Sequence, residues 1–117
     1  MATFSKRFLS GSTNGRGIKV AATATPGTLI HTAVAGTTNM DEVWLYVYNS
    51  HSAIVQLTIE WGGVTVPDDH IKVSIPARQG LLLVAPGLIL QNELAVRAFA
   101  GTADVLVITG FVNRIEP

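Results

Sequence analysis

The sequence contains no cysteine, little charge and no long apolar run, and each deficit excludes a class of protein. Without cysteine there is neither a disulfide framework nor a thiolate metal site. Basic and acidic residues are equal in number, which argues against a nucleic-acid partner. The longest apolar run, residues 81–90, is broken by Pro86-Gly87 and is shorter than a membrane span of about 20 residues. We therefore expect no membrane partner.

The shortage of charge is the most informative deficit. Charged residues make up 14% of the 117 residues, and hydrophobic residues make up 48%. An average protein has about 25% charged residues. A small domain has much surface for its volume and should need more charge than average. The excess apolar surface must therefore be covered by something.

The first 17 residues differ in composition from the rest of the chain. They contain Lys6, Arg7 and Arg16 and no acidic residue, and residues 10–17 are turn and linker types. This composition predicts an extended basic N-terminal arm over residues 1–17, followed by one domain over residues 18–117. We expect the arm to dock on an acidic or edge-exposing partner; the alternative is a frayed terminus.

After residue 17, apolar residues recur with a period of two, and no stretch has the apolar stripe of a helix. Turn residues interrupt the pattern about every ten residues. The sequence therefore predicts an all-β fold, an antiparallel β-sandwich of the jelly-roll kind, with eight or nine short strands. The expected segments are 18–22, 28–34, 43–48, 54–61, 71–75, 81–84, 88–90, 94–99 and 105–112.

Segment 54–61 alternates cleanly, which predicts one buried and one exposed face. Val55, Leu57, Ile59 and Trp61 share one face. The opposite face carries Gln56, Thr58 and Glu60, which we expect to be hydrated.

Segments 43–48, 81–84 and 105–112 are apolar on both faces. Such strands normally belong to sheets covered on both sides by helices, and this sequence predicts no helix. One face can enter the core of the sandwich. The other face needs the arm, a loop or another protein chain.

The aromatic stripe Trp44, Tyr46, Tyr48 shows the scale of this surface. Burying three such rings contributes on the order of 10–15 kcal/mol as an upper bound, and association costs about 4–15 kcal/mol. We predict an oligomer or partner interface here; the alternatives are a second small core under the arm, or a ligand platform. The same prediction assigns to the interface Leu106, Ile108 and Val112.

Catalytic and metal-binding patterns are weak. Each of His31, His51 and His70 falls in a different expected strand or turn, so their spacing alone does not bring them together at a metal site. The segment Asp68-Asp69-His70 follows a proline and is more typical of a turn than of a cation site. We predict no enzyme, no metal and no cofactor.

Several short strings resemble small structural proteins of tailed bacteriophages that are encoded beside the major capsid protein. The resemblance covers roughly residues 17–115. The strings fall at residues 41–46, 58–63, 67–69, 73–77, 96–100 and 111–115.

The resemblance implies a head decoration (cement) protein, commonly a trimeric β-sandwich on the capsid surface. The implied partners are further copies of the chain, most often as a homotrimer, and the major capsid protein. With that partner, we expect the arm residues Lys6, Arg7 and Arg16 to contact the capsid. The implied location is the virion, after synthesis in the host cytoplasm. Two alternatives remain open: a carbohydrate-binding or adhesin-like module, and a tail or connector component.

Overall fold

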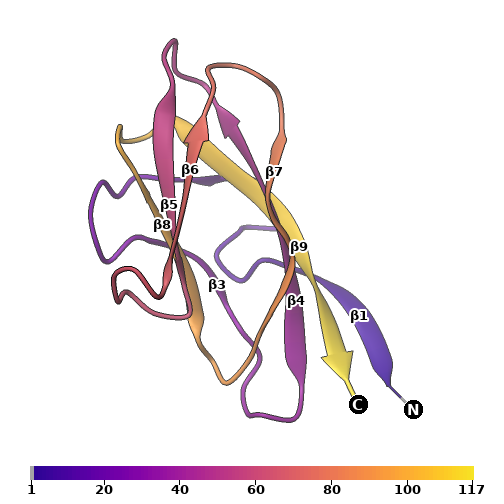
Figure 1. Cartoon of the computed structure of the whole chain (residues 1–117). Helices are drawn as coiled ribbons and strands as arrows, with labels where there is room; N and C mark the ends of the chain where they lie inside the picture. The colour runs from indigo at the N-terminus through magenta and orange to yellow at the C-terminus, as the bar shows by residue number, and fades with distance from the viewer. Residues whose placement is uncertain (1) are drawn as a thin grey trace.

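The computed structural model describes residues 2–117, which form two antiparallel sheets packed face to face, without helices (Figure 1). This confirms the predicted all-β sandwich. The strands are β1 (Thr3–Phe8), β2 (Ile18–Lys19), β3 (Thr28–Thr32), β4 (Met40–Asn49), β5 (Val55–Trp61), β6 (His70–Ile75), β7 (Leu82–Leu90), β8 (Ala95–Ala100) and β9 (Leu106–Glu116).

The strand order is that of a jelly roll. The larger sheet has the order β1-β9-β4-β7, and β2 also pairs with β9. The smaller sheet has the order β3-β8-β5-β6. The chain crosses repeatedly between the two sheets, so most paired strands are distant in sequence, with β5 and β6 as the consecutive pair. Both sheets close over one core.

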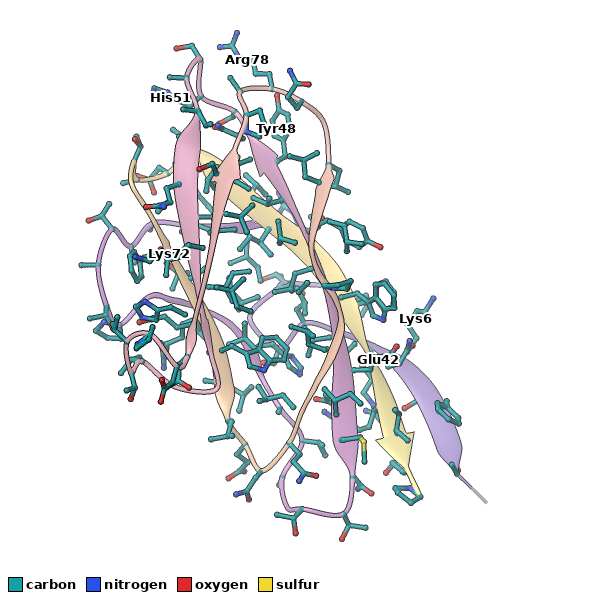
Figure 2. The ribbon with its side chains drawn as sticks, viewed as in Figure 1. Lys6, Glu42, Tyr48, His51, Lys72 and Arg78 are labelled. Atoms are coloured by element: carbon teal, nitrogen blue, oxygen red, sulfur yellow. The ribbon has the colours of Figure 1, made fainter. Side chains whose placement is uncertain are left out.

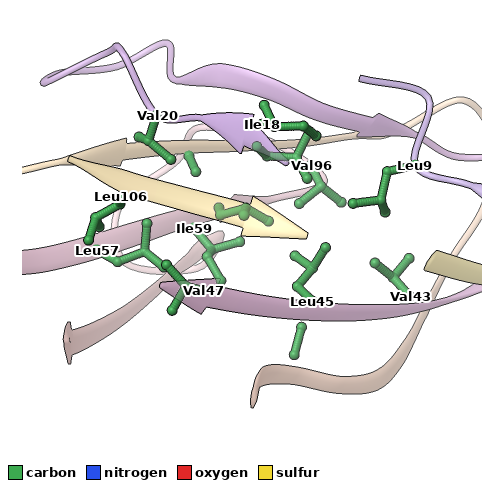
Figure 3. Packing of buried hydrophobic residues seen from close by; sticks show 14 of the residues in the cluster. Leu9, Ile18, Val20, Val43, Leu45, Val47, Leu57, Ile59, Val96 and Leu106 are labelled. Atoms are coloured by element: carbon green, nitrogen blue, oxygen red, sulfur yellow. The ribbon is translucent and has the colours of Figure 1, made fainter. Parts of the chain in front are cut away.

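The core lies between the sheets and follows from the alternation within each strand. In β4, the buried side chains Val43, Leu45 and Val47 alternate with more exposed ones. They face Leu57 and Ile59 of β5 across the sandwich, among the buried cluster drawn in Figure 3. Branched aliphatic side chains on a pleated surface pack well in this way.

The predicted arm is extended, and most of it is built into the sandwich. Strand β1 pairs with β9 of the same chain, from Thr3 opposite Glu116 to Phe8 opposite Phe111. Leu9 is only 2% exposed and belongs to the core cluster. The arm therefore does not stand apart from the domain after residue 17; Met1 lies outside the described residues.

Strand β7 runs through Pro86-Gly87, where we expected a turn between two segments. Its register with β4 shifts twice, between Val43 and Trp44 and again between Leu45 and Tyr46. A proline is tolerated because β7 is an edge strand and need not donate to a further neighbour. The two register shifts accommodate Pro86-Gly87 within one strand, where the sequence predicts a break between two strands.

The predicted hydrated face of β5 is wrong for two of its three residues. Thr58 and Glu60 are buried, and only Gln56 is exposed. The segment between β2 and β3 covers Glu60, because the Glu60 carboxylate accepts hydrogen bonds from Thr25 Oγ1 and from the Gly27 amide, both at 2.6 Å. A loop distant in sequence thus buries a face that alternation marks as polar.

Glu60→Ala should lower the free energy of unfolding by about 1–3 kcal/mol, because the Gly27 amide loses its buried acceptor. Gln56→Ala, on the same face but exposed, is the matched control and should change stability by less than about 0.5 kcal/mol. Urea denaturation of both variants measures the difference. Equal effects would contradict an anchoring role for Glu60.

Candidate functional site

The outer face of the larger sheet, which points away from the smaller sheet, is the main candidate surface. Register places Trp44 between Phe111 of β9 and Pro86 of β7. In the same way Tyr46 lies between Thr109 and Leu83. The rows continue onto β1, where Phe8 is paired with Phe111. The outer face is therefore apolar across four neighbouring strands.

Several of these side chains are open to solvent. Phe8 is 65% exposed, Leu83 is 48% exposed and Tyr48 is 36% exposed. Trp44 and Tyr46 are half-buried by their neighbours on the sheet. The predicted aromatic stripe thus lies on a surface whose exposed side chains include Tyr48 and Leu83, and the loop between β1 and β2 lies against its margin, at Phe8 and Val107.

Trp44 is held firmly at the centre of this face. Its ring is stacked on Phe111, with centroids 6.2 Å apart and planes 12° apart. Its edge lies over Gly87, where a Cβ atom would come within 2.9 Å of the indole. Its Nε1 atom donates to Glu42 at 2.7 Å. Hydrogen bonds from Asn113 and Trp44 lower the pKa of Glu42, which keeps this acceptor ionised.

The interface predicted on β9 is on the wrong face. Leu106, Ile108 and Val112 are fully buried in the core. The register with β4 explains this, because Val112 is opposite the buried Val43 and Ile108 is opposite the buried Val47. The outward side chains of this strand are Val107, Thr109 and Phe111.

The basic residues of the predicted arm are exposed and border the same surface. Lys6 Nζ lies 4.7 Å from the centroid of the Phe111 ring, and Arg7 donates to Ser5. Figure 2 shows Lys6 near Glu42, and the register places Asn113 between them. Arg16 lies in the loop between β1 and β2.

A hydrogen-bond network around the buried Asp41 ties the two sheets together, and sequence reasoning missed it. Asp41 of β4 accepts from Arg114 of β9, with Nε–Oδ1 at 2.8 Å, and pairs with His31 Nε2 of β3 at 2.8 Å. The other ring nitrogen of His31 accepts the Ser10 amide at 3.0 Å. The network therefore also fixes the chain just after β1.

The remaining polar residues singled out by sequence serve turns or lie apart. Asp69 Oδ2 accepts the Thr65 amide at 3.0 Å, as expected for a turn. His70 Nε2 is 3.9 Å from the buried Glu60 carboxylate, and His51 lies in the turn after β4. Within residues 2–117 no cluster of three or more His, Asp or Glu side chains could hold a metal ion. No helix in that range could cross a membrane.

Comparison with known proteins identifies no family for this chain. No family model, no curated protein and no solved structure matches it.

The environment of Asp41 makes the stability of the fold depend on pH. Burial raises the pKa of Asp41, but hydrogen bonds from Arg114 and His31 outweigh burial, so the pKa lies below its usual value. A lowered pKa means that the charged form stabilises the fold above the unfolded pKa of about 3.9. That stability is lost as the pH falls through the lower, folded-state pKa.

Asp41→Asn should therefore cost about 3 kcal/mol near neutral pH and progressively less below about pH 4. Urea denaturation of wild type and variant across this pH range measures the gap. The matched control is Asp104→Asn at an exposed turn, which should change stability by less than about 0.5 kcal/mol near neutral pH. A gap for Asp41→Asn that does not narrow in acid would contradict the network.

Proposed function

We propose that the protein is a structural subunit of a virion, a head decoration protein that oligomerises and clamps neighbouring major capsid subunits. The single observation that carries the proposal is the uncovered apolar outer face of the larger sheet, centred on Trp44. The resemblance of several short strings to small tailed-phage structural proteins is the reason for choosing a virion as the assembly. Jelly rolls are common among viral capsid domains, but this fold hosts many functions and adds little by itself.

The contrast between the two sheets supports an interface on one side only. The outer face of the smaller sheet carries Gln56, Lys72 and Ser74, which are exposed and polar. Its central residues Thr58 and Glu60 are covered by the chain itself. The larger sheet presents aromatic and aliphatic side chains instead, a composition typical of the centre of protein interfaces.

A closed symmetric oligomer would bury such a face against neighbouring copies and so prevent open-ended aggregation. In a ring of identical subunits, each copy covers apolar surface of its neighbour. A ring that touches several capsid subunits at once gains from effective concentration, so each contact can be weak. Contacts that exist only in the assembled shell stabilise that shell by mass action. A trimer is the expected ring.

Sedimentation equilibrium at micromolar concentration tests the self-association. Wild type should form an oligomer, with a trimer expected. Leu83→Ser and Tyr48→Ser should each raise the dissociation constant about tenfold or more, because each removes apolar area from the contact.

Two exposed apolar residues away from this face serve as matched controls. Ile54 is 64% exposed and Val66 is 66% exposed, and both lie in loops. Ile54→Ser and Val66→Ser should leave the mass distribution unchanged. A wild-type protein that stays monomeric, or control variants as disruptive as Leu83→Ser, would count against the proposal.

A carbohydrate-binding module is the second candidate, favoured by one observation. The parallel rings of Trp44 and Phe111 lie beside the polar groups of Glu42 and Asn113. Sugar sites combine aromatic platforms with such polar groups. Here Glu42 Oε1 already accepts from both Trp44 and Asn113, which leaves it less free for a hydroxyl. Binding on a glycan array, with a change in Trp fluorescence, would favour this candidate.

The tail or connector location uses the same surface and differs only in its neighbours. Antibody labelling of intact particles separates the two locations. Label on the head is expected, and label confined to the tail would move the proposal there.

A further inference from the structure

We propose that the free edge of β1, with the hollow beside it, binds an acidic extended segment of a partner protein by strand addition. This inference goes beyond the outer-face interface, because it concerns the free edge of β1, where the outer face ends at Phe8, and names the chemistry of the partner. It rests on the proposed function only in taking the partner to be another protein of the same assembly.

The backbone of β1 provides the first part of the site. Strand β1 is terminal in the order β1-β9-β4-β7, so only one of its two edges is paired. Five of its six residues are exposed. Figure 1 shows the strand beside β9, at the edge of the larger sheet. An unpaired edge presents amide and carbonyl groups that an extended peptide can complete.

A hollow of about 430 Å³ provides the second part. Aromatic rings of Phe8 and Phe111 form its apolar walls, and Gly15 leaves space where a side chain would meet the Phe8 ring. Gly15 has a φ of 84°, a conformation that favours glycine and holds the loop in place. An apolar side chain from an added strand can enter this space.

Charge provides the third part and selects the partner. Lys6 and Arg7 line the hollow, and Arg16 follows Gly15 in the adjoining loop. None of these three cations forms an ion pair within residues 2–117. Two acids of the same sheet are otherwise engaged or lie apart: Glu42 accepts from Trp44 and Asn113, and Glu116 lies opposite Thr3 at the far end of β1.

These three parts define one occupant. Successive residues of a strand point to opposite faces, so β1 presents Phe4, Lys6 and Phe8 on the outer face and Arg7 on the other. A partner strand that alternates apolar and acidic residues places apolar side chains beside Phe8 and carboxylates beside Arg7. A lysine-rich or uniformly apolar strand would leave this cationic rim unmatched.

The experiment uses the full chain and a short synthetic peptide in which glutamate alternates with valine. Binding is followed by NMR, and the expected result is chemical-shift change at the amides of residues 3–8 and 15–16. A peptide with glutamine in place of glutamate should bind about tenfold more weakly or worse at low salt. Peptides N-methylated at one or the other alternate set of residues should differ, because only one set of amides faces β1.

Variants of the protein isolate the charge. Arg7→Gln should weaken peptide binding about two- to fivefold, as expected for an exposed ion pair. Lys6→Gln should weaken it less, because Lys6 shares the outer face with the apolar residues of the peptide. Lys72→Gln, on the opposite side of the molecule in Figure 2, is the control and should have no effect. Because all three side chains are exposed, the fold should be preserved.

The outcomes separate this inference from the proposed function. No binding of the glutamate peptide, equal binding of the glutamine peptide, or shifts confined to the outer face of β4 would overturn the strand-addition site. The oligomer measured by sedimentation could still persist, and the proposed function would then stand without this site. Self-association lost on Arg7→Gln would instead identify a second copy as the occupant and overturn the separate partner.

Discussion

Strand β4 is apolar on both faces, and the chain covers only one of them. Val43, Leu45 and Val47 close the core against the smaller sheet. Trp44 and Tyr46 point the other way, onto the outer face, where they are half-buried beside the exposed Tyr48. Leaving such a surface in water carries a cost that scales with its area, and a partner removes that cost. The proposed assembly role follows from this imbalance.

The open face is not the result of a loose fold. Trp44 is stacked on Phe111, supported by Gly87 and hydrogen-bonded to Glu42, so the central ring is pre-positioned. The contact of Asp41 with His31 joins the two sheets, and Arg114 holds Asp41 within the larger sheet. A rigid apolar face loses little conformational entropy on binding, which favours association.

Much of the strand pattern was predictable from the sequence, because alternation depends on local chemistry. Alternation also showed that β9 is apolar on both faces, but it could not say which face is inside. The register with β4 decides that, and it places Val112 in the core and Phe111 outside. The pairing of β1 with β9 also joins distant segments, so the composition of the arm could not reveal it.

The buried polar residues were missed for a related reason. Glu60 is covered by a loop whose Gly27 lies far away in sequence, and Asp41 meets Arg114 from the other end of the chain. Spacing along the sequence carries no signal for such pairs. A carboxylate in an alternating strand therefore looks hydrated until the covering segment is placed.

Hydroxyl-radical footprinting by mass spectrometry, as a function of protein concentration, shows whether other copies of the chain cover the outer face. We expect the extent of labelling to decrease in parallel at Trp44, Tyr46 and Tyr48 as the protein concentration rises through the micromolar range. Labelling of Ile54, exposed in a loop away from this face, should stay constant. Unchanged labelling of the three aromatic residues at every concentration would contradict the claim that this face is covered by other copies of the chain.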